Sequence, residues 1–177
     1  MTEEASPSPL DPAELGAYFA LIEVSSLLRH TVEQQLRDAG DLSYVQFQLL
    51  ARLGDTADGS QRMTELADGV VYSRSGLTYQ VGLLEKAGLV ARGPSADDDR
   101  GVMVTITEVG RDVLARVFPG HIDVLRQLFL EPLARADIDS LARVLTVVRD
   151  HMRSIPPRSA RPRQKSAARQ SLTDGGA

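Results

Sequence analysis

Residues 64–106 decide the fold, and they read TELADGVVYSRSGLTYQVGLLEKAGLVARGPSADDDRGVMVTI. A short helix ends at Gly69, and after a three-residue turn a second helix spans 73–87, with Gly88 at the left-handed cap position just past its end. The apolar residues of this second helix recur at the i, i+4 and i+7 spacing of a buried face, and they are Leu77, Val81 and Leu84. The stretch therefore predicts two short helices joined by a tight turn.

The hydrophobic period changes after Gly88. Leu89 and Val90 begin a short strand, 93–99 is turn-like, and the apolar residues of 102–106 alternate with Met103 and Thr105. Two strands around a short turn form a β-hairpin. Two short helices followed by a hairpin predict a helix-turn-helix with a wing.

A long helix precedes this unit. Asp11, Pro12 and Glu14 form a helix start of the capping-box type, and Ala39-Gly40-Asp41 ends the helix after about 28 residues, or about 42 Å. Its broad apolar face comprises Leu15, Phe19, Leu21, Ile22, Val24, Leu28, Val32 and Leu36. Because so long an apolar face is hard to bury within one small domain, we expect a partner subunit.

Other segments carry helix starts and breaks. Ser43 and Gln46 predict a second capping box, 54–60 reads as a polar loop, and Thr64 is placed to cap the short helix before the turn. Further signals of this kind lie at Ser73 and Thr107, which are expected N-caps, at Pro119, where we expect a kink or break near Phe118, and at Asp137, which should open a final helix.

Composition sets limits on function. The chain has 177 residues, 20 Lys and Arg against 24 Asp and Glu, and no Cys, which excludes disulfides, thiol sensing and a Cys nucleophile. The net charge of −4 argues at first against a nucleic-acid partner. Residues 153–177, however, hold six basic groups and one acid, a net of +5, which leaves −9 on the remainder. Neither a secretory signal nor a membrane span is recognisable, so we expect a cytoplasmic protein.

The second short helix is the expected reading element. In a winged helix-turn-helix this helix enters the major groove, whose width of about 12 Å accepts one helix. Its exposed residues near the N-terminus are Arg74, Ser75, Thr78 and Tyr79, and Ser73 caps it. Arg can read guanine, and hydroxyls can bond base edges or phosphate. The alternative is a solvated helix face, which the attached hairpin makes the weaker interpretation.

The wing carries acids at its tip, where DNA phosphates would repel them. Asp97, Asp98 and Asp99 are followed directly by Arg100. We expect Asp98 to hold the Arg100 guanidinium in one pose, since an oriented Arg is favoured in a narrow minor groove. The alternative is an ordinary turn with solvated acids.

These motifs resemble those of the MarR (multiple-antibiotic-resistance regulator) family of winged-helix transcription factors. The resemblance is carried by Leu66-Ala67, by 73–78, by 84–90, by 98–104 and by 106–111, and the long flanking helices extend it to about 11–153. It implies an obligate homodimer that binds a pseudo-palindromic operator, usually as a repressor, and is released by a ligand. It also places Arg74, Ser75, Thr78 and Tyr79 in the major groove and Arg100 in the minor groove.

The predicted fold class is mainly α (α+β), a winged helix-turn-helix with long N- and C-terminal dimerisation helices. The expected organisation is a disordered N-terminus at 1–10, a dimerisation helix at 11–42, the DNA-binding region at 43–106, C-terminal dimerisation helices at 107–153 and a basic disordered tail at 154–177.

The chain departs from the family pattern at several DNA-facing positions. Many members have a basic residue in place of Tyr79, a charged pair in place of Gly82 and Leu83, and a second Arg in place of Gly101. Residues 59–111 hold six basic groups against seven acids. We therefore expect DNA affinity to depend on few positions and to have a shallow salt dependence.

Two other functions were weighed. An enzyme is disfavoured because His30, His121 and His151 are scattered, and we see no metal-ligand spacing, phosphate loop or nucleophile elbow. No cofactor or metal is implied. A winged-helix relative that binds a small molecule or protein without DNA stays open because the unit is acidic. For an aromatic or phenolic effector, the candidate lining residues are Tyr18, His30, Tyr44 and Phe47, with ordinary core packing as the alternative.

Overall fold

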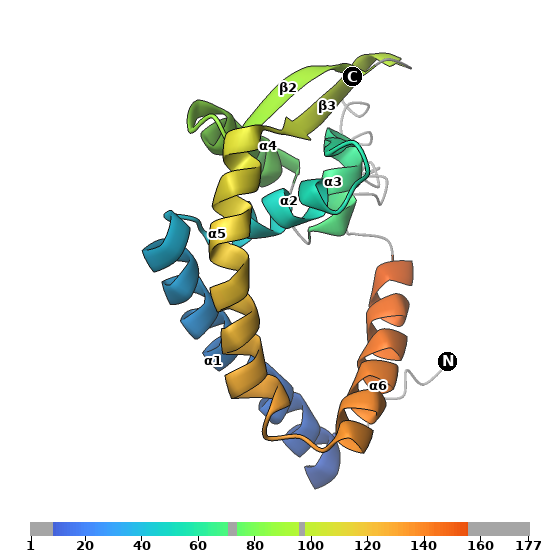
Figure 1. Ribbon diagram of the computed structural model, residues 1–177. Helices are drawn as coiled ribbons and strands as arrows, with labels where there is room; N and C mark the ends of the chain where they lie inside the picture. Colours follow the sequence, from blue (N-terminus) through green and yellow to red (C-terminus); the bar gives the residue numbers. More distant parts are fainter. Residues whose placement is uncertain (1–8, 71–73, 96–97, 156–177) are drawn as a thin grey trace, which may run out of the picture. The chain divides into compact units, whose positions relative to one another are not determined.

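The computed structural model describes residues 9–70, 74–95 and 98–155. The chain forms two compact units, Met1–Pro132 and Leu133–Ala177, and the second contains α6. The elements follow in the order α1 (Pro12–Gly40), α2 (Tyr44–Gly54), β1 (Ser60–Arg62), α3 (Met63–Gly69), α4 (Arg74–Lys86), β2 (Val90–Ser95), β3 (Asp98–Ile106), α5 (Glu108–Leu125), the π-helical turn η1 (Arg126–Leu130) and α6 (Arg135–Ser154) (Figure 1). The predicted fold class is confirmed.

The long helix α1 begins and ends as its sequence predicts. The Asp11 carboxylate accepts the backbone N–H groups of Ala13 (2.7 Å) and Glu14 (2.9 Å), and Glu14 accepts the Asp11 N–H (2.8 Å). Asp41 caps the other end with φ 53°, a left-handed conformation that Asp tolerates better than most residues. The 29-residue helix is thus fixed at both ends by local hydrogen bonds.

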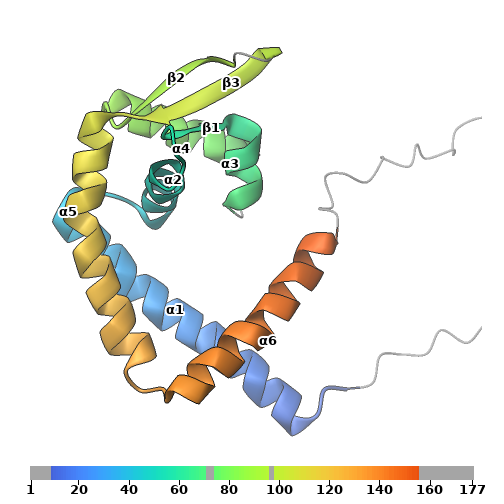
Figure 2. The same cartoon turned by 45° about the vertical axis from the view of Figure 1, so that its right-hand side comes forward.

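The C-terminal half of α1 packs along α5, and the two helices run side by side in both ribbon views (Figures 1 and 2). Gln35 Nε2 donates to the Val117 carbonyl (3.1 Å), and Arg116 Nε donates to the Ala39 carbonyl (3.0 Å). A Cβ atom at Gly40 would lie 2.5 Å from Val117 Cγ1, so the contact needs a glycine there. Only this half of α1 contributes to the core.

The core joins the small helices to the sheet. Phe47, Leu49, Leu50 and Leu53 of α2 are buried, and the predicted inner face of α4 is confirmed because Leu77, Val81 and Leu84 are at most 1% exposed. They pack in one cluster with Val32, Leu36, Leu42, Leu66, Val70, Leu89, Val90, Val104, Ile106 and Val117. The apolar periodicity of these segments therefore decides which side of each element faces inward.

The sheet has one strand more than the sequence predicts. β1 begins at Ser60, the last residue of the stretch expected to be loop, and it pairs antiparallel with β3, giving the order β1-β3-β2. Ser60 Oγ and Thr105 Oγ1 share a hydrogen bond (2.7 Å) across this pair. The strand Ser60–Arg62 lacks the apolar alternation that would identify it in the sequence. It forms because its backbone pairs with β3.

The hairpin strands also extend further than expected (Figure 2). β2 continues to Ser95 and β3 begins at Asp98, so most of the predicted turn 93–99 is strand. The register shifts at Pro94/Ser95. Pro94 is compatible with β2 because β2 is an edge strand, where a missing N–H leaves no ladder partner unpaired.

Two helix starts were wrongly predicted, and the break expected within a third helix does not occur. Thr64 does not cap α3, which begins at Met63 with Glu65 accepting the Arg62 N–H (3.3 Å). Asp137 lies in the first turn of α6, and Ala134 occupies the cap position. Helix α5 continues through Pro119 to Leu125, so the chain does not break near Phe118, because a helical proline removes only one N–H and α5 packs against α1. The kink that was the other expectation at this position stays a prediction.

The base of the hairpin is tied to both neighbouring helices. Gly88 has φ +72°, and the Leu89 N–H bonds the Leu84 carbonyl (2.9 Å), which completes the predicted glycine cap of α4. Thr107 caps α5 as predicted: its hydroxyl accepts the Gly110 N–H (3.0 Å) and donates to the Gly88 carbonyl (2.7 Å). One hydroxyl therefore joins the end of α4 to the start of α5.

We expect Gly110→Ala to destabilise the protein. A Cβ atom there would overlap the backbone carbonyl oxygen of Leu89, and neither backbone can move freely. The free energy of unfolding should fall by about 1–3 kcal/mol in urea denaturation. The matched control is Gly82→Ala in α4, whose Cβ would meet nothing within 4 Å in the described structure and should add about 0.5–1 kcal/mol. Equal stability changes in the two variants would contradict the close approach.

An aromatic cluster joins α2 to α5. The Phe47 ring lies 4.5 Å from the His121 ring and 6.4 Å from the Phe118 ring, measured between centroids. Burial lowers the pKa of His121, because the charged imidazolium loses hydration there. Its Nδ1 atom is buried and has no hydrogen-bond partner within the described residues. The folded state thus favours the neutral ring.

This lowered pKa makes stability depend on pH. The unfolded chain binds a proton at His121 below the ordinary histidine pKa of about 6.5, whereas the folded chain resists protonation until its lowered pKa is reached. The free energy of unfolding should therefore fall as pH drops through this window. His121→Phe keeps the aromatic packing and should weaken that fall, measured by urea denaturation at pH 7.5 and 5.5. An unchanged pH dependence would exclude His121 as its source.

Candidate nucleic-acid interface

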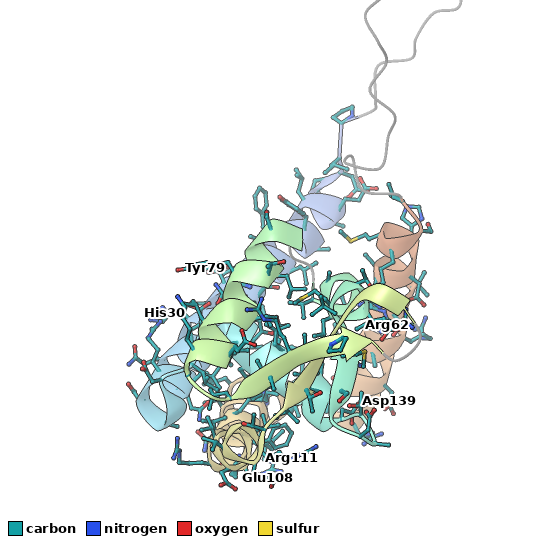
Figure 3. The ribbon with its side chains drawn as sticks, turned by 90° about the horizontal axis from the view of Figure 1, so that it is seen from above. His30, Arg62, Tyr79, Glu108, Arg111 and Asp139 are labelled. Atoms are coloured by element: carbon teal, nitrogen blue, oxygen red, sulfur yellow. The ribbon has the colours of Figure 1, made fainter. Side chains whose placement is uncertain are left out.

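Helix α4 presents two opposite faces. Its inner face is buried in the core, and Ser75, Thr78 and Tyr79 on the other side are exposed. Tyr79 is 65% exposed and projects from the outer side of α4 in Figure 3. The structure therefore brings these three predicted residues together on one accessible surface near the N-terminal end of the helix.

The remaining predicted DNA-contacting residues are placed only in part. Arg74 is the first residue of α4, and Asp98 and Arg100 lie at the start of β3, at the far end of the hairpin from Thr107. The side chains of these three residues, and Ser73 as a whole, lie outside the described structure. The expected contact between Asp98 and Arg100 therefore stays a prediction.

One ion pair, which the sequence analysis missed, connects α4 with β2. Arg92 Nε donates to Glu85 Oε2 (2.8 Å), and Arg92 Nη2 donates to the same oxygen. These hydrogen bonds hold the pKa of Glu85 below its ordinary value. A signal was available in the sequence, because Glu85 is an acid in the last turn of a helix, where the helix dipole favours cations. An acid at this position is expected to have a partner outside the helix.

The four candidate effector residues do not form one site within the chain. Tyr18 is exposed and packs edge-on against Phe19, with ring centroids 5.3 Å apart. His30 is also exposed, and the twelve helical residues between it and Tyr18 correspond to a rise of about 18 Å. The Arg29 guanidinium carbon Cζ lies over the Tyr44 ring, 5.2 Å from the ring centroid. Phe47 belongs to the cluster with His121. The expected shared cavity is therefore not found in this chain alone.

A groove between α2 and α5 is the alternative that the structure offers. It has a volume of about 440 Å³ and is open to solvent, and its walls are mainly apolar, with Arg111 and Asp55 as the charged groups. Arg111 lies in the first turn of α5 and faces Glu108 at 3.9 Å (Figure 3). Its other lining residues are Ala51, Gly54, Leu114, Ala115, Phe118 and Pro119. A small, partly apolar molecule would fit such a groove.

Two further features of the described residues bear on function. Across 9–70, 74–95 and 98–155, no helix combines the length and apolar character that a membrane span requires. Over the same ranges, His, Asp and Glu side chains nowhere gather in the groups of three that could hold a metal ion.

Comparison with known proteins agrees with this architecture. The MarR family model matches residues 40–101. The transcriptional repressor YetL of Bacillus subtilis is 28% identical over 112 residues, a match that spans 63% of this chain and 66% of YetL, just under two-thirds of that protein's length.

Two crystal structures from Streptomyces coelicolor are similar over nearly their full length. Sco3205, a MarR family transcriptional regulator in complex with DNA, is 31% identical with a TM-score of 0.80 over 89% of this chain and 96% of Sco3205. AbsC, another MarR family regulator, is 30% identical with a TM-score of 0.80 over 84% of this chain and all of AbsC. The chain therefore belongs to the MarR family of transcriptional regulators, which confirms the sequence prediction of a regulator and not an enzyme.

Proposed function

We propose that this protein is a homodimeric transcriptional repressor that binds a pseudo-palindromic DNA operator and responds to a small ligand. The observation that carries the proposal is the exposed face of α4 beside an extended hairpin, both anchored in one core. Support comes from Sco3205, whose crystal structure is a complex with DNA, and from YetL, which is named a repressor.

In the proposed complex α4 enters the major groove. Ser75, Thr78 and Tyr79 would reach base edges or phosphates, and Arg74 at the helix start would read a guanine. The hairpin β2–β3 would follow the DNA backbone and bring Arg100 to the minor groove, with Asp98 orienting it. These roles combine a base-reading helix with a wing that positions it.

Dimerisation is supported by apolar surface that the chain leaves uncovered. Phe19 and Leu27 of α1 are 60% and 64% exposed, although α1 buries Val32 and Leu36 further along. The other exposed apolar residues in this half of α1 are Leu15, Tyr18, Leu21, Ile22 and Val24. Helix α6 by itself exposes Val144, Val147, Val148 and Met152 at spacings that place them on one face. Contiguous apolar surface of this kind is typical of subunit interfaces.

The proposed ligand response is supported by the groove between α2 and α5. The groove between α2 and α5 has a volume within the range of about 300–1,000 Å³ usual for small-molecule sites. Aromatic or phenolic compounds are the class that its apolar wall and the Arg111 cation would accept together. Binding would be recognised by a ligand-dependent rise in Tm and by release of bound DNA.

Selection of bound fragments from random DNA tests the proposed function. We expect enrichment of a palindrome whose half-sites lie about one helical turn, or about 10 bp, apart. If no palindrome is enriched at moderate salt, the chain is instead a winged-helix relative that binds a small molecule or protein without DNA.

The two arginines should have different effects on the selected site. Arg74→Ala is expected to cost about 1–3 kcal/mol and to relax the base preference at one position, because it removes a base contact. Arg100→Ala should weaken binding with less change in preference. Both are measured by titration of matched and mismatched sites. Wild-type affinity in Arg100→Ala would exclude the wing contact.

Leu27→Glu should disrupt the dimer. The side chain is 64% exposed in the single chain, so the charge costs the subunit fold little, whereas burying it unpaired in an interface is unfavourable. Sedimentation should show a shift toward monomer and loss of operator binding. Glu23→Gln on the same helix is the control and should stay dimeric. A dimeric Leu27→Glu protein would place the interface elsewhere.

A further inference from the structure

In addition to the backbone junction at Gly88 and Leu89, the Glu85 carboxylate connects helix α4 with the wing strand β2. Besides the two guanidinium contacts to Glu85 Oε2, the backbone N–H of Arg92 donates to Glu85 Oε1 (3.3 Å). Both oxygens of the carboxylate are thus used, and Arg92 is held by its side chain and its backbone together. The strand direction at Arg92 is therefore tied to the helix.

Glu85 is poorly placed for the helix itself. It lies next to the last residue of α4, close to the C-terminal carbonyl groups that carry the partial negative charge of the helix dipole. A carboxylate at that end is repelled by the helix dipole, so the helix gains nothing from it. The contact that Glu85 makes is with β2, which points to a role in holding the wing.

The pair stays charged but adds little to folding stability. The hydrogen bonds from Arg92 lower the pKa of Glu85, and those to Glu85 raise the pKa of Arg92, so both groups are ionised around neutral pH. Their side chains are 34% and 37% exposed, which leaves the pair screened by water and salt. Breaking the pair should therefore leave the protein folded.

The length of the wing amplifies a small change in strand direction at Arg92 into a larger displacement of Arg100. Arg92 pairs with Val104 in the sheet, and Arg100 lies four residues further along β3, a reach of about 13 Å at roughly 3.3 Å per residue. A change of about 10° in strand direction at the pair would move Arg100 by about 2 Å over that reach. Such a shift would lose a hydrogen bond, whose length varies by only about 0.5 Å.

We propose that Glu85 and Arg92 are positioning residues for DNA binding, whose ion pair fixes the direction of the wing relative to α4. Arg100 then meets the minor groove while α4 occupies the major groove. The inference rests on the proposed DNA-binding function, and it assigns these two residues a role that involves no contact of their own with DNA.

Glu85→Gln gives a test that is decided by whether DNA affinity rises or falls. Removing an acid near DNA would tighten binding if only charge mattered, because phosphate repulsion falls. Positioning predicts the opposite, at least about threefold weaker affinity for the selected operator, with Tm changed by no more than about 2 °C. Arg92→Ala should show a similar loss. If Arg92 bound phosphate directly, Arg92→Ala alone would weaken binding and Glu85→Gln would not.

A double-mutant cycle with Arg100→Ala shows whether the pair acts through the wing tip. The Glu85→Gln/Arg100→Ala protein should bind DNA no more weakly than Arg100→Ala alone, because Arg100→Ala has already removed the DNA contact that the ion pair positions. Arg135→Gln is the matched control: it breaks an exposed ion pair with Asp139 (3.1 Å) on α6 and should leave operator affinity unchanged.

The outcomes distinguish the positioning role of Glu85 and Arg92 from the proposed DNA-binding function. Unchanged or tighter binding by Glu85→Gln, or additive losses in the double mutant, would overturn the positioning role while the proposed function stands. A wild-type protein that selects no DNA sequence would overturn both.

Discussion

The fold depends on the backbone junction where α4, β2, β3 and α5 meet. The Leu89 carbonyl accepts the Thr107 N–H (3.0 Å) and lies against Gly110, so that no side chain fits between hairpin and helix. The Thr107 hydroxyl adds the bond to Gly88 at the end of α4. Because these contacts involve backbone atoms, they are short and nearly independent of side-chain repacking. A displacement of the start of α5 must therefore be felt by the wing and by α4 together.

Around this junction the chain divides its apolar residues between two tasks. Most of those in α2, α4 and the sheet are buried in the core, as Leu50 and Leu77 are. Those in the first half of α1 and on α6 stay exposed in the single chain. The net charge of −4 is a property of the whole chain, whereas the described face of α4 proposed to meet DNA presents the uncharged side chains of Ser75, Thr78 and Tyr79.

The sequence predicted those parts of the fold that are specified locally. The capping boxes at Asp11 and Ser43, the glycine cap at Gly88 and the inner face of α4 were all correctly located, because each depends on residues within one or two turns. Strand β1 was missed because its pairing partner lies more than 40 residues away. For α5 the sequence left a kink or a break at Pro119 open, since the packing of α1 against α5 is not visible in a local pattern.

The candidate site was predictable to the same limit. Periodicity located the exposed residues Ser75, Thr78 and Tyr79, but it could not show that Glu85 reaches Arg92, because that contact depends on how the strand leaves the helix. For the effector candidates, sequence proximity did not show how far apart they lie in one chain. Twelve helical residues separate Tyr18 from His30 in α1, a rise of about 18 Å. Local patterns define faces, whereas a shared cavity needs the distances between them.

The half-uncovered helix α1 has a genetic consequence. In the proposed dimer, pairing depends on the first half of α1, whereas DNA reading depends on α4, and the two surfaces are more than 40 residues apart in sequence. A copy with a damaged α4 but an intact α1 would still pair with a normal copy, and the mixed dimer would not bind the operator. Variants that lose DNA reading alone should thus act dominantly in a cell that also makes the normal chain, while variants that lose α1 pairing should be recessive.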